Sequence, residues 1–402
     1  MRSVRILIVH NAYQLQGGED TVVDSELALL RSHGHDVEIY TRKNSEIVRM
    51  SSFAVARQTL WSDRTTHEIS TLLSRFRPDV IHSHNTFPLV SPSLYWVAAH
   101  AKVPVVQTLH NFRLMCLNAL YLRESEICEE CLGRAPWRGV MHRCYRSSFS
   151  ASAVLGGMLS LHRALGTYRK KISRYIALNS FCRNKFIAAG FSKEKINVKP
   201  NFYNPSILVD TGQTERSNAL FVGRLSREKG VVTLLKAWHE LHVPLRIVGD
   251  GPFMTLFFKE NNPRVELLGR ISRQQVSVTM GRSTFLVVPS ECYENFPMVL
   301  VEAFAHGLPV VASRLGAMAE IVEDGYTGLH FEPGNAQDLA QKVQWLYDHP
   351  VECRQMGDNA RREYEAKYTP ERNYQILMKI YEEAIEERRR DRRLKEARSE
   401  KR

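Results

Sequence analysis

Short hydrophobic runs alternate with longer amphipathic stretches through most of the 402 residues. The runs are rich in Val, Ile and Leu and end at Gly, Pro, Asn or Asp, a pattern typical of strands that are buried on both faces. They predict two series of strands, a first at 4–10, 36–42, 79–85, 103–111, 174–180 and 196–201, and a second at 219–224, 244–251, 264–270, 283–290 and 308–314. Because helical patterns separate the runs, the sequence predicts parallel sheets with helices on both sides.

A polar stretch at 203–219 divides the two series and predicts two domains. We expect an α/β protein in which two doubly wound parallel-sheet domains, 1–200 and 201–370, face one cleft. A helix from about 370 could pack back on the first domain, and 386–402 is expected to be a charged, solvated tail. Ligands of such sheets bind beyond the carboxyl ends of the strands.

The composition, with 44% hydrophobic and 24% charged residues, is that of a globular protein. No apolar run approaches the roughly 18 residues that a membrane-spanning helix needs. The first run, Val4 to Val9, is too short for a secretion signal. Seven cysteines, an odd number, then indicate reduced thiols. We expect a cytoplasmic protein, with attachment to the inner face of the cell membrane as a further option.

The positive charge is confined to the first half of the chain. Residues 1–200 hold 27 Lys and Arg against 15 Asp and Glu, whereas 201–402 hold 28 of each kind, so the net charge of +12 belongs to the first half. This asymmetry predicts an anionic partner. The sequence contains no nucleic-acid-binding motif, so a membrane surface or an anionic acceptor is the better interpretation.

Two acidic residues accompany a predicted helix start in SECYENFPMVLVEAFAHGLPVVAS, 290–313. Pro297 suits the first helical turn, which places Glu294 in the loop before the helix and Glu302 in its second turn, about 12 Å along the axis. Free backbone N–H groups around Phe296 to Val299 would form an anion site. The alternative is a capped surface helix with an incidental pair of glutamates.

Two further loops carry candidate ligand groups. In FVGRLSREKG, 221–230, Arg224 and Lys229 follow a strand and could neutralise a diphosphate, or could belong to an ordinary basic loop. Gly17 and Gly18 follow the first strand, where glycine lets the backbone approach a bound phosphate or sugar. Taken alone, a Gly pair is more often a simple turn.

Together these residues resemble the signature of retaining glycosyltransferases of family four. The segments DVIHSHN, TLHNFR, IVGDGP and 290–313 stand in the order that this family shows, over nearly the whole chain. The resemblance implies two Rossmann-like domains with the active site between them (the GT-B fold). It also implies a nucleotide-sugar donor, with a uridine diphosphate sugar expected before guanosine diphosphate mannose.

The resemblance also assigns roles. Arg224 and Lys229 would bind the donor diphosphate, Glu294 would contact the sugar hydroxyls and Glu302 the ribose. His110 would lie beside the reacting face of the sugar; outside this context, a buried, hydrogen-bonded histidine would be favoured. The remaining donor contacts would come from Gly17 and Gly18 and from the backbone around the predicted helix start: Asn295, Phe296, Met298 and Val299.

The segment 111–148 is a cysteine-rich insertion that the catalytic motifs do not explain. Its cysteines, Cys116, Cys128, Cys131 and Cys144, have the spacing C-x11-C-x2-C-x12-C. Four thiolates with one CxxC suit a structural zinc site. Buried reduced cysteines or a redox-labile pair are the alternatives.

A basic amphipathic stretch follows at 155–174. Leu155, Met158, Leu159 and Tyr168 are among the residues at helical spacing, and Arg169-Lys170-Lys171 follow them. Such a helix can lie on an anionic membrane. The alternative is a helix that packs in the core and has a solvated basic end.

We therefore expect a glycosyltransferase of the hexosyltransferase type that acts on a glycan or lipid-linked acceptor in polysaccharide or glycoconjugate synthesis. The chain lacks an Asp-x-Asp, a common way to hold a divalent metal on a nucleotide sugar, so no cofactor is expected for catalysis. The alternatives are a nucleotide-sugar epimerase of the same fold and a non-catalytic, membrane-associated sugar-binding scaffold.

Overall fold

The computed structural model describes residues 3–14, 17–205 and 216–399, which form two compact units. The N-terminal unit takes in Met1–Ala119, Glu129–Pro200 and Asn373–Arg402, and the C-terminal unit takes in Leu120–Cys128 and Asn201–Arg372. Residues 120–128, which the sequence predicts in the first domain, group with the C-terminal unit. Each unit contains a six-stranded parallel sheet, so the predicted pair of Rossmann-like domains is confirmed.

The N-terminal sheet is built from β1 (Arg5–Ala12), β2 (Asp36–Lys43), β3 (Val80–Ser83), β4 (Val105–Leu109), β7 (Arg174–Ala177) and β8 (Ile196–Val198). Its strand order is β2-β1-β3-β4-β7-β8. Ile8 of β1 is paired with His82 of β3, and Val106 of β4 with the same His82. The order changes direction between β1 and β3, which makes the carboxyl ends of these strands the expected ligand site.

The helices of the N-terminal unit are α1 (Gly18–Ser32), α2 (Ser52–Leu60), α3 (Asp63–Phe76), α4 (Ser93–His100), α5 (Trp137–Met141), α6 (Phe149–Ala164), α7 (Thr167–Lys170) and α8 (Ser180–Ala188), with 3-10 turns at Asn44–Arg49 and Lys193–Lys195. Helix α3 shows why they form where they do. The Ser62 hydroxyl accepts a hydrogen bond from the Thr65 N–H at its start, and Ile69 and Leu73 are buried one turn apart. The helix ends at Arg77, which takes a left-handed conformation before Pro78.

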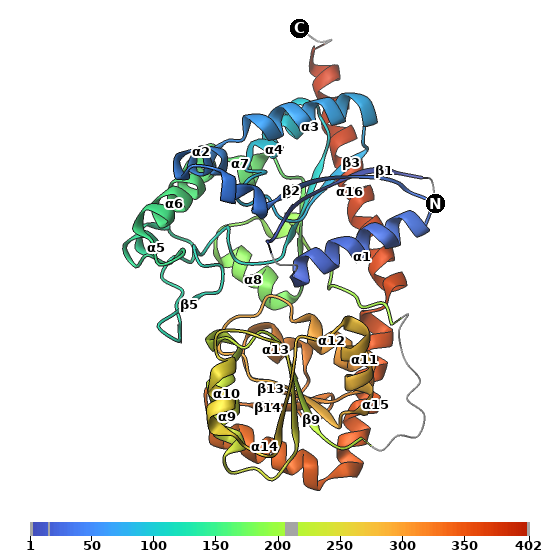
Figure 1. Cartoon of the computed structure of the whole chain (residues 1–402). Coiled ribbons are helices and arrows are strands. Elements are labelled where there is room, and N and C mark those ends of the chain that lie inside the picture. Colours follow the sequence, from blue (N-terminus) through green and yellow to red (C-terminus); the bar gives the residue numbers. More distant parts are fainter. Residues whose placement is uncertain (1–2, 15–16, 206–215, 400–402) are drawn as a thin grey trace. The chain divides into compact units, whose positions relative to one another are not determined.

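Helix α16 (Pro370–Ser399) begins in the C-terminal unit and continues in the N-terminal unit, where it runs beside the sheet (Figure 1). Leu377, Tyr381 and Ala384 are fully buried at helical spacing. The Tyr381 hydroxyl lies 2.7 Å from His82 Nδ1, and Glu387 forms an ion pair with Arg174. The predicted solvated tail from 386 is therefore wrong at its beginning, since Glu387 is held by the N-terminal unit.

The C-terminal sheet consists of β9 (Ala219–Val222), β10 (Leu245–Val248), β11 (Val265–Gly269), β12 (Phe285–Val288), β13 (Val310–Ser313) and β14 (Gly328–Phe331), in the order β11-β10-β9-β12-β13-β14. Its helices are α9 (Val231–Trp238), α10 (Met254–Glu260), α11 (Arg273–Arg282), α12 (Met298–Ala305), α13 (Gly316–Ile321), α14 (Ala336–Asp348) and α15 (Pro350–Lys367), with a 3-10 turn at Arg227–Lys229. A hairpin of β5 (Leu122–Arg123) and β6 (Glu126–Ile127) completes the unit.

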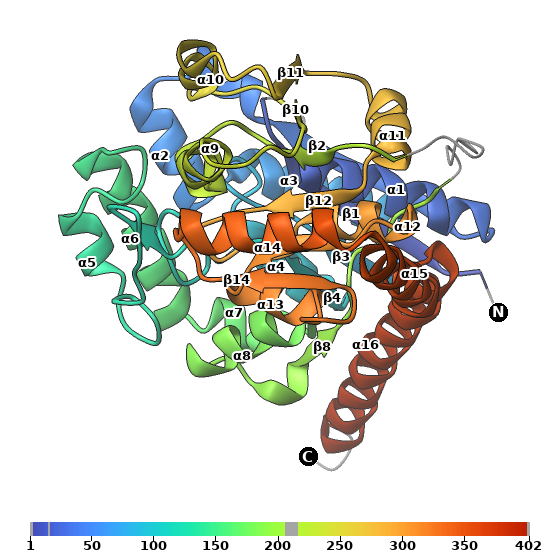
Figure 2. The ribbon, with the colours of Figure 1, turned by 90° about the horizontal axis from the view of Figure 1, so that it is seen from below.

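Helices cover both faces of this sheet, with α9 packed beside α14 and α12 beside α15 (Figures 1 and 2). One core combines apolar side chains of α9, α14 and the strands, among them Trp238, Phe285 and Val343. The buried Trp238 Nε1–H donates to the Val243 carbonyl, so its polar atom is satisfied. No helix of the described residues has the length and apolar character that crossing a bilayer requires.

Candidate functional site

The predicted diphosphate loop and the acidic loop follow neighbouring strands of the C-terminal sheet. Arg224 and Lys229 come after β9, and Glu294 comes after β12, which is paired with β9. Strands β10 and β12 flank β9 on opposite sides, so the chain changes direction across the sheet here. This is the position at which doubly wound sheets leave room for a ligand.

Lys229 and Glu294 form an ion pair within the C-terminal unit. The Lys229 Nζ lies 2.5 Å from Glu294 Oε1, and the buried Ser290 hydroxyl donates to the same oxygen over 2.8 Å. The Glu294 side chain is only 14% exposed, so both hydrogen bonds hold it firmly. Burial of Lys229 opposes its charge, but the charge of Glu294 and their hydrogen bond prevail and raise the pKa of Lys229. The structure thus brings a charged lysine and a glutamate together as one group.

Backbone contacts fix the two loops against each other. Gly230 takes a φ of +68°, and a Cβ there would lie 1.7 Å from the Pro289 carbonyl oxygen, so only glycine fits. The Glu291 N–H donates to the Glu228 carbonyl, and the Thr233 hydroxyl donates to the Glu291 carboxylate. Lys229 therefore owes its position to close packing of the β9 and β12 loops.

The start of α12 leaves backbone N–H groups without a side-chain cap. Pro297 is the residue before the helix, and its side chain makes no capping hydrogen bond, so the N–H groups of Met298 and Val299 are available to a ligand. Asn295 and Phe296 are buried, and Phe296 packs against Tyr368 with 6.1 Å between ring centroids. Packing thus fixes the loop before α12, and the anion site at this helix start stays a prediction.

Glu302 lies in the second turn of α12, as predicted. Burial raises the pKa of its carboxyl to about 7, although the charge of Arg273 acts in the opposite direction. The Glu302 carboxyl is therefore partly neutral and partly ionised near neutral pH.

Arg224 is exposed. The N–H of its neighbour Leu225 donates to the Asp250 carbonyl over 2.7 Å, which ties the Arg224 loop to the end of β10.

In the N-terminal unit the glycine loop is held by Asp20. The Asp20 carboxylate accepts hydrogen bonds from the Gly17 N–H and the Tyr13 N–H, and lies 2.8 Å from His10 Nε2. Gly17 has an extended backbone, and a Cβ on Gly18 would meet open space among the described residues. Neither the backbone conformation nor the packing of the described residues demands glycine at Gly17 or Gly18, and a role of the pair in ligand binding stays a prediction.

His110 follows β4 and lies against His84, which follows β3. Their ring nitrogens, His84 Nδ1 and His110 Nε2, are 2.9 Å apart, and the rings are stacked at 18°. Burial lowers the pKa of His84 to about 3 and holds the pKa of His110 well below its ordinary value. Both imidazoles are therefore neutral at pH 7. His110 is half-buried and lines a pocket with Asn85, Thr86 and Arg113.

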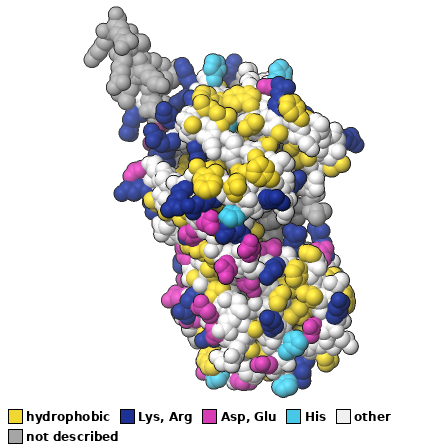
Figure 3. Space-filling model, turned by 90° about the vertical axis from the view of Figure 1, so that its left-hand side faces the viewer, with side chains coloured by type: hydrophobic (Ala, Val, Ile, Leu, Met, Phe, Trp, Pro, Cys, Tyr) yellow, Lys and Arg dark blue, Asp and Glu magenta, His cyan; other side chains and the backbone are white. Residues whose placement is uncertain are grey.

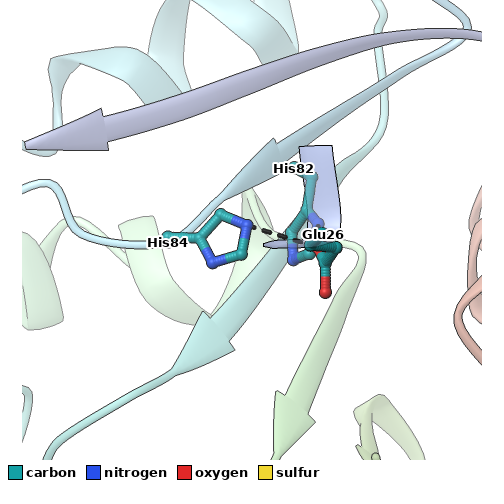
Figure 4. Close-up of side chains that lie close together, drawn as sticks. All are labelled: Glu26, His82 and His84. Atoms are coloured by element: carbon teal, nitrogen blue, oxygen red, sulfur yellow. Dashed lines mark ion pairs between the residues drawn. The ribbon is translucent and has the colours of Figure 1, made fainter. Parts of the chain in front are cut away.

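A buried carboxylate lies behind these histidines. Glu26 of α1 has Oε1 at 2.8 Å from His82 Nδ1 and at 3.3 Å from His84 Nε2 (Figure 4). Its Oε2 lies 2.9 Å from Lys199 Nζ. All four side chains are buried. Burial disfavours the charge of Glu26, but Lys199 and His82 outweigh it and hold the pKa of Glu26 well below its ordinary value.

Three residues around this site were not predicted from the sequence: Asp20, Glu26 and Lys199. His84 was part of a quoted segment, DVIHSHN, without a role. The sequence does contain a sign of this cluster, because α1 carries the carboxylates of Asp20 and Glu26 on an otherwise apolar face. Glu26 is 1% exposed and lies between the buried Val23 and Leu29. A charged residue on a buried face needs a partner, but the sequence does not say which.

The structure separates the two interpretations of 155–174. Leu155, Met158, Leu159 and Tyr168 are buried in the N-terminal unit, so the predicted membrane-facing stripe is wrong and these residues pack in the core. Lys171 lies 4.4 Å from the centre of the Trp96 ring. At least Lys171 of this basic end therefore contacts the protein itself, through the Trp96 ring.

The cysteines of the insertion are divided between the units. Cys116, Cys131 and Cys144 belong to the N-terminal unit, and Cys128 belongs to the segment that groups with the C-terminal unit. Cys116 and Cys131 are buried, and the Cys116 thiol donates to the Asn118 side chain over 2.9 Å. The zinc site remains a prediction. In the same segment Tyr121 packs edge-on against Tyr293, the residue before Glu294.

Comparison with known proteins relates both halves of the chain to glycosyltransferases. The profile of the glycosyl transferase 4-like domain matches residues 17–201, and that of the glycosyl transferases group 1 family matches residues 210–363. An uncharacterized glycosyltransferase of Methanocaldococcus jannaschii is 34% identical over 220 residues, which are 52% of this chain and 62% of that protein. The chain thus spans less than two thirds of that relative.

Solved structures show the same fold at low sequence identity. Sucrose-phosphate synthase from Thermosynechococcus elongatus superposes with a TM-score of 0.71 at 18% identity, over 95% of this chain and 98% of that one. Anabaena HepE, solved in complex with UDP, gives a TM-score of 0.63 at 19% identity, over 94% of this chain and 99% of its own. With the profile matches to both halves, the chain belongs to the glycosyl transferases group 1 family and has the GT-B fold.

Proposed function

We propose that the chain is a retaining glycosyltransferase of the hexosyltransferase type that uses a nucleoside-diphosphate sugar. The observation that carries the proposal is the group formed by Lys229, Glu294 and Ser290 at the carboxyl ends of β9 and β12. A fixed lysine charge suits a diphosphate, and a carboxylate suits sugar hydroxyls. The UDP complex of Anabaena HepE supports a uridine nucleotide as the first donor to test.

In the proposed reaction, the bond from the sugar to the diphosphate breaks and leaves an oxocarbenium-like sugar. An acceptor hydroxyl then attacks with retention, and its proton passes to the departing diphosphate. Negative charge grows on the departing diphosphate, where Arg224 and Lys229 stabilise it. Glu294 contacts hydroxyls of the sugar, and Glu302 accepts hydrogen bonds from the ribose. Since the sequence has no Asp-x-Asp, we expect these two cations to supply the charge, and transfer should continue in a chelator.

The acceptor is proposed to be a glycan or a lipid-linked glycan that is met at an anionic membrane surface. Support comes from exposed apolar side chains on neighbouring helices of the N-terminal unit: Phe53 on α2, Trp137 and Met141 on α5, and Phe149 and Leu161 on α6. Figure 3 shows hydrophobic side chains gathered on this unit with Lys and Arg around them. We call these five residues the apolar patch.

Basic residues accompany the apolar patch. Arg134 is exposed before the start of α5, and Arg143 and Arg146 are exposed in the segment that links α5 to α6. Exposed Trp, Phe and Leu with flanking arginines suit the interface of an anionic bilayer, where each cation contributes about 1 kcal/mol. This surface replaces the buried stripe of 155–174 as the candidate membrane contact.

The proposed reaction is tested by following donor and acceptor separately. A thermal-shift screen of nucleoside diphosphates and their sugars first identifies the donor, because a ligand at 100 times its Kd adds about 2.7 kcal/mol of stability. The chosen donor is then incubated with glycan and lipid-linked acceptors. We expect nucleotide release that depends on the acceptor, and a product with the anomeric configuration of the donor.

Two results would contradict the proposal. Conversion of the donor sugar into an isomer without any acceptor would indicate an epimerase. Donor binding without nucleotide release under every acceptor condition would favour the sugar-binding scaffold.

A further inference from the structure

Four buried or half-buried side chains form a continuous series of contacts behind the proposed sugar site. Lys199 contacts Glu26 over 2.9 Å, Glu26 faces His84 Nε2 over 3.3 Å, and His84 Nδ1 faces His110 Nε2 over 2.9 Å. Glu26 Oε1 and His84 Nε2 are both inaccessible to water. Glu26 Oε1 also lies 2.8 Å from His82 Nδ1, whereas Glu26 is the ion-pair partner of His84 Nε2 among the described residues. Glu26 Oε1 is therefore the polar group best placed to satisfy His84 Nε2.

The charge of Glu26 determines where the protons lie. Lys199 is 1% exposed and contacts Glu26 Oε2, so this buried pair is stable only when both members are charged. An ionised carboxylate only accepts hydrogen bonds, which puts the proton of neutral His84 on Nε2. His84 Nδ1 is then an acceptor, and the 2.9 Å contact requires a proton on His110 Nε2.

We propose that Glu26 is a positioning residue that acts through His84 to hold His110 with its proton on Nε2 and its lone pair on Nδ1. His110 Nδ1 is then available to accept a hydrogen bond from a substrate hydroxyl at the pocket that His110 lines. The inference rests on the proposed function for the identity of that substrate as a sugar. A neutral acceptor also avoids placing a cation beside a sugar on which positive charge develops.

A metal ion is the competing explanation for the same atoms. The ligand atoms of Glu26, His82 and His84 lie within 4.8 Å of one another. However, Lys199 already supplies the positive charge that balances Glu26, and His82 Nε2 lies 2.7 Å from the Thr108 hydroxyl, which can donate to it. His82 Nδ1 then carries a proton, which faces both Glu26 Oε1 at 2.8 Å and the Tyr381 hydroxyl oxygen at 2.7 Å. The hydrogen-bonded arrangement accounts for the contacts without an added cation.

The direct test is the protonation of the His110 ring in the wild-type protein. Long-range proton–nitrogen correlation spectra of protein with ¹⁵N-labelled histidine distinguish protonated from unprotonated ring nitrogens, and loss of signals in His110→Asn assigns His110. We expect neutral His110 with the proton on Nε2 at pH 7. A proton on Nδ1, or a rapidly exchanging mixture of both forms, would overturn the proposal. This result does not depend on any activity, so a failure of the proposed function is distinguishable.

Variants then test what the arrangement contributes to transfer. His84→Asn keeps an acceptor oxygen at the position of Nδ1, whereas His84→Leu has a similar size and no acceptor. We expect His84→Leu to lower kcat about 10–100-fold with little change in the KM of the donor, and His84→Asn to recover much of that loss. Equal losses in both variants, or a change confined to KM, would contradict a role in orienting His110.

Glu26→Gln completes the test, with Glu26→Gln/Lys199→Met as the version that leaves no buried lysine unpaired. In whichever of these two variants folds, we expect His110 to lose its single tautomer. We also expect kcat to fall by about the same factor as in His84→Leu. Retention of the wild-type tautomer in both would overturn the role of Glu26. A divalent metal bound stoichiometrically to the wild type and lost in His84→Asn would also overturn it, because the three atoms would then be ligands.

Discussion

Glu302 is a carboxyl group whose burial sets its chemistry. Its pKa near 7 means that the folded protein binds the proton far more tightly than the unfolded chain does. The free energy of unfolding therefore decreases as the pH rises from the ordinary pKa of glutamate through about 7. Ionised Glu302 thus destabilises the folded protein, and a ligand that donates hydrogen bonds to the ionised carboxylate would offset this loss of stability.

The first prediction concerns Glu302→Gln, which mimics the protonated carboxyl at every pH. We expect the variant to melt at a higher temperature than the wild type at pH 8, and the difference to vanish near pH 4, where both proteins are neutral at this position. Thermal unfolding at pH 4, 6 and 8 measures it. An equal or lower melting temperature of the variant at pH 8 would contradict the buried, destabilised carboxylate.

The same substitution should weaken donor binding. Ionised Glu302 accepts hydrogen bonds from the ribose in the proposed site, so wild-type affinity should increase as the pH rises through about 7, and that dependence should disappear in Glu302→Gln. Titration of the nucleoside diphosphate at pH 6 and 8 measures both. Identical pH dependence in the two proteins would remove Glu302 from the donor site.

Which residues could be predicted depended on how far apart the chain places them. Arg224 and Lys229 stand five positions apart in one loop, and Glu294 and Glu302 flank one helix start, so local sequence was enough. Glu26, His84 and Lys199 come from a helix, a strand end and the segment after β8. Only the tertiary structure brings such residues together, and a sequence pattern carries no record of the pairing.

At the level of elements, α16 shows how the end of the chain is fixed to the N-terminal unit. Leu377 is fully buried, whereas Glu382 on the same helix is exposed. We expect Leu377→Ala to lower the free energy of unfolding by about 2–5 kcal/mol, and Glu382→Ala to change it by less than about 0.5 kcal/mol. Denaturant unfolding of both variants measures the difference. Equal stability of the two would mean that α16 is not part of the core.

The cysteine-rich insertion carries a separate prediction. If its four cysteines bind zinc, protein purified under reducing conditions should contain about one zinc per chain, and Cys131→Ser should lose the metal and melt at a lower temperature. Cys353→Ser is the matched control, since Cys353 is equally buried but lies on α15. Metal analysis that finds no zinc in reduced wild-type protein would leave buried thiols as the explanation.

Two elements show where the sequence patterns were insufficient. The strand β14, Gly328–Phe331, was not predicted, because four residues that begin with glycine give almost no alternating signal. The stripe of Leu155 and Leu159 has the periodicity of any helix with one apolar face. Periodicity identifies the buried face of a helix but does not distinguish a protein core from a lipid surface, so the exposed apolar patch was found only in the structure.

For the molecule as a whole, the apolar patch predicts binding to anionic membranes. We expect wild-type protein to sediment with vesicles that contain acidic lipids, and Met141→Glu/Phe149→Glu to remain in solution. Phe258→Glu is the matched control, because Phe258 is as exposed as Met141 but lies on α10 of the C-terminal unit. Raising the salt concentration should weaken wild-type binding, since the attraction is screened within about 10 Å.

Undiminished vesicle binding by the double variant would mean that the patch faces another partner. Transfer to a short soluble acceptor should survive the double substitution in either case, because the proposed diphosphate contacts lie in the C-terminal unit.

The central claim is that Lys229 and Arg224 stabilise the departing diphosphate, and transfer kinetics of Lys229→Ala and Arg224→Ala at saturating donor test it most directly. Each variant should lose about 10²–10³-fold in kcat, equivalent to about 2.7–4 kcal/mol, because the lost contact strengthens as charge develops. Lys236→Ala, which removes an exposed lysine from the neighbouring helix α9, should transfer at the wild-type rate. Near wild-type kcat in both site variants, with the fold intact, would contradict the proposed donor site.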